Sequence, residues 1–300
     1  MMSLQGKANI LMVIVTMFWG VSYTFMRMGL ESLETFNIVA WRCSIAFIVA
    51  GILFNKRMKN IQVKTLVYAG IQGFLLFAVF SLSLFGLETT SVSNAGFILS
   101  LTVVIVPIFS SILERKLPSG AVSIAVICTI IGIAILTLKD SLSFQLGDIL
   151  VAVAAVAYSI YLILNSKFTK SVDSIAYGIY QLGFAALFAL ICTVIFETPT
   201  IPSTPKSWIA ILGLGLICTA FCFIAQSVAQ QYTSPTHTGL IFSLEPIFAA
   251  FFAILFIDEP FTLKLCIGGS LILMGNLVAQ WEQLYQNRFL RKTNTHRKTA

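Results

Sequence analysis

One carboxylate stands inside a long apolar stretch of the sequence. Glu245 lies about nine residues into the segment 236–257, and Pro246 follows it directly. A charge in apolar surroundings is costly, so it predicts a partner or an aqueous cavity. Glu245 could bind a cationic substrate group or a proton, or it could form an ion pair with Arg42 that only fixes helix packing. We also expect Pro246 to kink its helix, because proline frees the carbonyl four residues earlier.

Glu245 belongs to a polar stripe that is repeated elsewhere in the chain. His237 lies eight residues before it, so on a helix the two side chains share a face. A shift of 143 residues places Asn94 on His237 and Thr102 on Glu245. Matching stripes are expected if both helices line one cavity. Alternatively, His237 and Asn94 are helix-end caps and Thr102 bonds its own backbone.

Aromatic residues at helical spacing offer a wall for a solute. Trp19 and Tyr23 are four residues apart, and Tyr158 and Tyr161 are three apart. Such rings could hold apolar or aromatic solutes, and the tyrosines can also form hydrogen bonds. The alternative is a belt at the membrane interface, which fits Trp19 less well because it falls near the middle of its segment.

Four further polar residues are candidates for the same cavity because the two halves of the chain align them. Ser83 falls on Gln226 by the shift of 143, and Arg42 falls on Gln181 by a shift of 139. Gln226 could bridge helices or meet substrate, and the pair Arg42 and Gln181 could face either packing or cavity.

No motif for catalysis, a metal or a cofactor is found. Asp140, Asp148, Asp173 and Asp258 all fall at ends of apolar segments, whereas an intramembrane aspartyl protease needs two within them. The histidines are far apart, the six cysteines fit small packing residues, and no G-x-x-x-x-G-K-[ST] loop for ATP is present. We therefore expect that the protein is not an enzyme and that it binds no cofactor and no metal.

The composition requires lipid as the solvent of these elements. Hydrophobic residues make up 58% of the 300, charged residues only 10%, and the mean hydropathy is +0.92. A soluble domain carries about a quarter charged residues, and a helical span needs about 20 apolar ones. We predict an all-α integral membrane protein with ten transmembrane helices. Their approximate limits are 9–29, 36–54, 65–86, 92–113, 121–138, 147–165, 174–196, 208–230, 236–257 and 262–281.

The net charge of +7 is distributed by topology. With the N-terminus inside, fourteen of the 19 Lys and Arg residues fall in inner loops or the tail. This bias predicts cytoplasmic N- and C-termini, and it argues against nucleic-acid binding. The first apolar stretch is too long for a cleaved signal peptide, so we expect it to be the first span of a multi-pass protein. The short N-terminus before it suggests a bacterial inner membrane.

The two halves of the chain indicate an internal repeat. Under the shift of 143, Thr90-Ser91 falls on Thr233-Ser234 and Gly132 falls on Gly275. Five spans in each half would make the repeats inverted, as in many transporters with a site at the repeat interface near the midplane. We predict a first repeat over 1–143, a second over 144–282 and a basic cytoplasmic tail over 283–300.

Short motifs in this order resemble the EamA-type ten-helix permeases of the drug/metabolite transporter superfamily. They are Phe18-Trp19-Gly20 with Ser22, Arg42, the Gly96…Leu101…Pro107 pattern, Leu244-Glu245-Pro246, Asp258-Glu259-Pro260, and Gly268, Gly269 and Gly275. The resemblance covers about residues 8–280 and implies a 5+5 inverted-repeat bundle with a central cavity, usually exporting amino acids or other small metabolites. Tyr158-Ser159 departs from the Trp-Gly of the first half.

These observations predict a secondary transporter that exports a small organic solute by alternating access. A channel or facilitator for small solutes is the alternative, although no ring of like polar groups marks a pore. The partners expected are a small-molecule substrate, the lipid bilayer and a proton as coupling ion, with no nucleic acid. Substrate, coupling ion, net direction and oligomeric state are left open.

Overall fold

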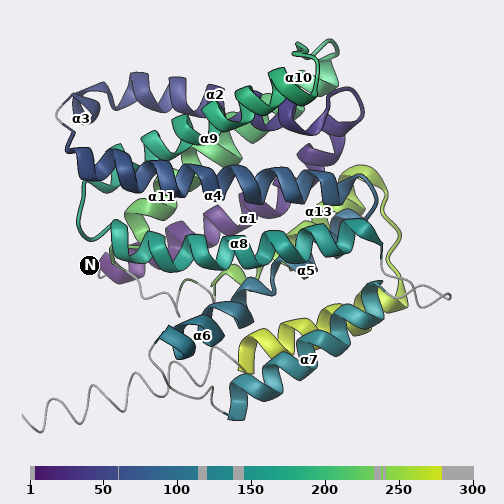
Figure 1. The fold of residues 1–300 in the computed structure, drawn as a ribbon. Helices are drawn as coiled ribbons and strands as arrows, with labels where there is room; N and C mark the ends of the chain where they lie inside the picture. Colours follow the sequence, from purple (N-terminus) through teal and green to yellow (C-terminus); the bar gives the residue numbers. More distant parts are fainter. Residues whose placement is uncertain are drawn as a thin grey trace, which may run out of the picture.

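A computed structural model describes residues 4–59, 61–113, 120–137, 145–232, 238 and 241–278. Within these ranges the secondary structure is helical and contains no strands. The helices are α1 (Leu4–Leu30), α2 (Thr35–Leu53), α3 (Asn55–Met58), α4 (Val63–Leu87), α5 (Val92–Leu99), α6 (Thr102–Leu113), α7 (Gly120–Thr137), α8 (Leu146–Phe168), α9 (Ser174–Phe196), α10 (Pro205–Leu212), the π-helix η1 (Gly213–Phe221), α11 (Cys222–Ala229), α13 (Glu245–Ile257) and a last helix over Leu263–Val278. The long helices run side by side (Figure 1).

Seven helical segments are long and apolar enough to cross a membrane. They are Leu4–Leu30, Thr35–Leu53, Val63–Leu87, Val92–Leu113, Leu146–Phe168, Ser174–Phe196 and Pro205–Ala229. Three shorter apolar helices cover Ser123–Leu136, Glu245–Ile257 and Leu263–Val278. The prediction of an all-helical membrane protein is confirmed, while the count of ten spans and the five-plus-five repeat stay predictions.

Large apolar side chains on the outside of the bundle fit a lipid surround. Val194, Phe196 and Leu263 are more than two-thirds exposed, whereas much of the interior is alanine and small polar residues. In water such an outer surface would be unfavourable, and in lipid it carries no cost. The bundle therefore has the surface of a membrane protein and a core that permits close helix contact.

The helices begin where the sequence supplies caps. Asp173 accepts hydrogen bonds from the backbone N–H groups of Ile175 and Ala176 at the start of α9. Thr204 and Ser207 form a capping box at the start of α10, with Pro205 in the first turn. Both arrangements satisfy backbone donors that a helix N-terminus leaves free, so they fix where these helices start.

The packing of the helices follows a regular scheme. Helix α4 packs on α8 and α9, and the α10–η1–α11 segment packs on α1 and α2. Helix α13 packs on α1, and the α5–α6 segment packs on α8. At the edge of the bundle, α7 lies beside the last helix (Figure 1), where a Cβ on Gly132 would come 2.7 Å from the Gly268 carbonyl oxygen. Only a residue without a side chain permits this approach.

Two of the apolar segments contain a break. Turns at Ser100 and Leu101 separate α5 from α6, and turns at Ser243 and Leu244 precede α13. Pro246 therefore lies in the first turn of α13, and an interruption of the helical segment directly before it stands where a kink is expected. Proline fits a first turn because its missing N–H would have no helical partner there.

Candidate functional site

Seven helices enclose a small cavity in the centre of the bundle. Its volume is about 40 Å³, which accommodates water but not an organic solute. Helices α1, α2, α4, α5, α8, α11 and α13 contribute its wall. The lining residues are Trp19, Ser22, Tyr23, Met26, Arg42, Val79, Phe80, Ser83, Leu99, Tyr158, Phe223 and Glu245.

The carboxylate of Glu245 lies in this wall and is held by a residue from the other half of the chain. Tyr23 Oη donates a hydrogen bond of 3.0 Å to Glu245 Oε1. Glu245 is 8% exposed and stands at the start of α13, where the helix dipole favours a negative charge. The break before α13 thus presents a carboxylate to the cavity at a helix N-terminus.

Arg42 lies in the same wall, but it does not pair with Glu245. Its Nε donates to Thr219 Oγ1 at 3.0 Å, its Nη1 lies 3.3 Å from Met26 Sδ, and its guanidinium carbon lies 3.8 Å from the centre of the Phe80 ring. The interpretation of Arg42 and Glu245 as an ion pair is therefore wrong. The reason is geometric: Tyr23 bonds the carboxylate, while α4 and η1 hold the guanidinium.

The π-helix η1 supplies acceptors to two of the cavity residues. Trp19 Nε1 donates to the Cys218 carbonyl oxygen at 3.1 Å, and Arg42 bonds the neighbouring Thr219. A π-helical segment is rare and often marks a functional position. Here it orients one aromatic and one charged side chain toward the cavity.

Aromatic rings form the wall that the sequence predicted. The Trp19 ring packs against Tyr158, Phe223 and Phe242, with centroid separations of 6.2, 5.1 and 5.0 Å. Tyr158 in turn stacks on Tyr161 at 5.5 Å. Trp19 and Tyr158 are buried by protein and line the cavity, so the alternative of a belt at the membrane interface does not apply to them.

The cavity brings together six of the twelve predicted site residues. They are Trp19, Tyr23, Arg42, Ser83, Tyr158 and Glu245. Ser83 is 3% exposed, and its hydroxyl has no hydrogen-bond partner among the described residues.

Two predicted residues bond the backbone and do not line the cavity. Asn94 Nδ2 donates to the Leu136 carbonyl oxygen at 3.3 Å. Thr102 Oγ1 bonds the carbonyl oxygens of Leu99 and Ala155 at 2.8 and 3.2 Å. The alternative that Thr102 bonds backbone describes its geometry. Leu99 ends α5 at the adjacent break, and Ala155 lies on α8, which packs against α6.

Three more predicted residues are buried behind the cavity wall. Tyr161 Oη donates to Gln181 Oε1 at 3.2 Å, and both residues are fully buried. Gln226 is fully buried on α11 and does not line the cavity. The bond between Tyr161 and Gln181 joins α8 and α9 behind the aromatic wall, whereas the amide atoms of Gln226 have no hydrogen-bond partner among the described residues. His237 lies outside the described residues.

Sequence reasoning missed the neutral residues that surround the guanidinium. Phe80 lies three residues before Ser83 on α4, so its position on the cavity face follows from helical spacing. Thr219 and Phe223 are four residues apart on the segment that carries Gln226. The contacts of Phe80 and Thr219 with Arg42 have no signal in the sequence, because they join α4, η1 and α2, which are distant along the chain.

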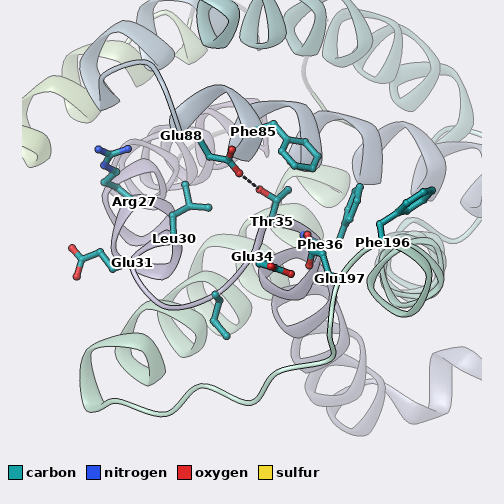
Figure 2. Close-up of a pocket in the computed structure, with 11 residues that line it drawn as sticks. Arg27, Leu30, Glu31, Glu34, Thr35, Phe36, Phe85, Glu88, Phe196 and Glu197 are labelled. Atoms are coloured by element: carbon teal, nitrogen blue, oxygen red, sulfur yellow. Dashed lines mark hydrogen bonds between the residues drawn. The ribbon is translucent and has the colours of Figure 1, made fainter.

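A second, larger hollow of about 680 Å³ lies beside the loop between α1 and α2 (Figure 2). Its wall carries four carboxylates and one cation, which are Glu31, Glu34, Glu88, Glu197 and Arg27. Three of the carboxylates have structural bonds. Glu197 accepts from the backbone N–H groups of Phe36 and Asn37, Glu88 accepts from Thr35, and Glu31 pairs with Lys206.

The two hollows follow one another along α1. Met26 lines the central cavity, and Leu30 lines the outer hollow one turn later on the same face. A ligand leaving the cavity in this direction would meet an acidic, open vestibule.

Both halves of the chain match one family of known proteins. The model of the EamA-like transporter family matches residues 6–138 and again residues 145–280. The chain belongs to this family. The expected resemblance to EamA-type permeases of the drug/metabolite transporter superfamily is thereby confirmed.

Relatives of this family member are named as transporters. One from Archaeoglobus fulgidus, an "uncharacterized transporter", is 23% identical over 291 residues, covering 91% of this chain and 96% of its own length. The uncharacterized transporter YoaV of Bacillus subtilis is 22% identical over 279 residues, covering 90% and 95%. A crystal structure with 19% identity has a TM-score of 0.69 and covers 91% of this chain and 96% of its own, so the fold is shared.

Proposed function

We propose that this EamA-family protein is a secondary carrier that exports amino acids or other small organic metabolites by alternating access. The observation that carries the proposal is the buried carboxylate of Glu245 in the central cavity, at a helix N-terminus and bonded to Tyr23. A polar group so placed in a membrane protein is expensive unless it binds something. Glu245 would take a proton or a cationic substrate group.

A five-plus-five inverted repeat is part of this proposal. The family model matches each half of the chain separately. The contact of α4 with α8 and α9 corresponds to the contact of the α10–η1–α11 segment with α1 and α2. In the same way, α13 on α1 corresponds to α5–α6 on α8. Alternating access by inverted repeats requires equivalent contacts of this kind in the two halves, so that the two halves can exchange conformations.

The size of the central cavity supports a carrier over an open pore. At about 40 Å³ it is far below the roughly 300 Å³ of a small-molecule site. The helices around it must separate before an organic solute can bind. With the predicted orientation, the acidic hollow beside the α1–α2 loop opens to the outside, and both termini lie in the cytoplasm of a bacterial cell.

The test is uptake and counterflow of small metabolites in proteoliposomes containing the wild type or Glu245→Gln. We expect Glu245→Gln to remain folded and to lose most of its saturable transport, because it can neither take up a proton nor pair with a cation. Asp173→Asn is the matched control, since Asp173 pairs with Arg57 at the surface, lines neither hollow, and can be replaced by asparagine as the cap of α9.

Unchanged transport and unchanged pH dependence in Glu245→Gln would contradict the role of the carboxylate. Fast flux that does not saturate in the wild type would favour a channel instead of a carrier.

A further inference from the structure

The guanidinium of Arg42 is a buried cation surrounded by neutral groups. Arg42 is 1% exposed and stands on α2 in the wall of the central cavity. Its neighbours are the hydroxyl of Thr219, the sulphur of Met26 and the face of the Phe80 ring. These groups orient the guanidinium, but none carries a negative charge.

A buried charge in a protein normally has an opposite charge beside it, because removing an unpaired ion from water is costly. In the described part of the chain, the ion pairs are Arg57 with Asp173 and Lys206 with Glu31, both at the surface. Glu245 is the one carboxylate among the described residues of the cavity wall, and it accepts from Tyr23. The described part of the chain therefore holds Arg42 in position and contributes no counter-ion to it.

A second feature of the same wall points to a ligand. The Ser83 hydroxyl is nine-tenths buried, lines the cavity and has no hydrogen-bond partner among the described residues. Ser83 and Phe80 are three residues apart on α4, so the hydroxyl lies on the helix face that carries the ring under the guanidinium. Buried hydroxyl groups are normally bonded, so this one is available to an acceptor that enters the cavity.

We propose that the transported solute carries one carboxylate group, which Arg42 binds with its planar fork and to which Ser83 donates a further hydrogen bond. This inference rests on the proposed function as a carrier. Arginine matches a carboxylate because two parallel N–H groups meet its two oxygens. A dianion such as a phosphate ester fits less well, since Arg42 is the single cation among the described residues of the wall and Glu245 is also there.

The test compares solutes that differ only in this group. Because the cavity wall is aromatic, the solutes carry a phenyl ring. L-Phenylalanine is compared with L-phenylalaninamide, 3-phenylpropionate is compared with 3-phenylpropanamide, and phenethyl phosphate is the dianion. Binding to the purified full-length protein is measured by thermal stabilisation, and transport by uptake in proteoliposomes. We expect the two carboxylates to raise the melting temperature of the wild type and the two carboxamides to have little effect.

Variants of the wall locate the preference. In Arg42→Gln we expect the Kd of the carboxylates to rise roughly 10- to 100-fold, the equivalent of a lost charge-assisted hydrogen bond. Arg42→Lys keeps the charge without the fork and should recover part of the affinity. Lys206→Gln removes a surface cation and should leave binding unchanged. If Arg42→Gln does not fold, Ser83→Ala tests the proposed carboxylate site through the hydrogen bond that Ser83 donates.

Three results would overturn the assignment. They are equal binding of carboxamides and carboxylates by the wild type, an unchanged carboxylate preference in Arg42→Gln, or tighter binding of phenethyl phosphate. Transport of the carboxamides that depends on Glu245 would refute the carboxylate assignment and leave the proposed function standing. If no solute showed saturable transport, both would fail.

Discussion

The two helix breaks of the bundle have equivalent positions and different chemistry. One break lies at Ser100 and Leu101, and the other lies at Ser243 and Leu244, 143 residues later. In each case a polar residue begins the helix that follows. Thr102 begins α6 and Glu245 begins α13.

What these two residues bond to decides their roles. Thr102 bonds the carbonyl oxygens of Leu99 and Ala155, so its polar atom is used by the scaffold. Glu245 reaches across to Tyr23 on α1 and lines the cavity. The same break in the backbone occurs in both halves. The side chain that follows the break determines whether that position is part of the scaffold or is available for binding.

The largest expected effect comes from the packing behind the second break. A Cβ on Gly20 would lie 2.4 Å from Phe248 Cβ and 2.8 Å from the Phe248 carbonyl carbon. Gly20→Ala should therefore push α1 away from α13 and cost at least about 1–3 kcal/mol, as overpacking does. We expect a lower melting temperature in detergent and a lost Tyr23–Glu245 contact, seen as lost transport.

The control is Gly70→Ala on α4, where a Cβ would meet only ring carbons of Phe184 at 3.8 Å or more. This variant should be at least as stable as the wild type, because alanine favours helix by about 1 kcal/mol over glycine. Equal stability of the two variants would show that the close approach of α1 and α13 does not hold the second break in place.

An intermediate effect is expected from Tyr23→Phe. The change removes the hydrogen bond to Glu245 and leaves the ring in the aromatic wall. A hydrogen bond to a charged group contributes about 1.5–3 kcal/mol, so saturable transport should fall by roughly tenfold or more. The measurement is initial uptake rate against solute concentration; a wild-type rate would mean that Glu245 needs no partner on α1.

The smallest effect is expected at the first break. Thr102→Val keeps the side-chain shape and removes the hydrogen bonds to Leu99 and Ala155. A side-chain hydrogen bond in a membrane protein contributes about 0.6 kcal/mol to stability on average. We expect a small fall in melting temperature and an unchanged uptake rate. A loss of transport as large as that of Glu245→Gln would make the two breaks functionally equal and end the distinction between them.

The positions of the helices were largely predictable, and the breaks within them were not. The segment expected over 174–196 is α9 with the same ends, because Asp173 caps it. The segment expected over 92–113 contains the break at Ser100, which leaves no mark in the hydrophobic pattern. Apolar residues on both sides of a turn give the sequence pattern of one continuous helix, since positions that face lipid and positions that face protein are both apolar.

The candidate site was predictable only in part for a related reason. Glu245 and Arg42 stood out because charges inside apolar segments are rare. The alignment of the two halves, not charge, predicts Thr102 and Gln181. Thr102 Oγ1 bonds Leu99 and Ala155, and Gln181 Oε1 accepts from Tyr161, all away from the cavity. Polarity inside a span predicts a partner, but it does not say whether that partner is backbone, another side chain or a ligand.

The sequence by itself determined that lipid is the solvent, that the elements are helices, and which residues within them are costly to bury. These properties depend on composition and local periodicity, which any segment carries with it. The tertiary structure alone decided that Glu245 bonds Tyr23 while Arg42 rests on Phe80 and Thr219. Such contacts depend on how each helix is rotated against its neighbours, and rotation is fixed by packing across the whole bundle.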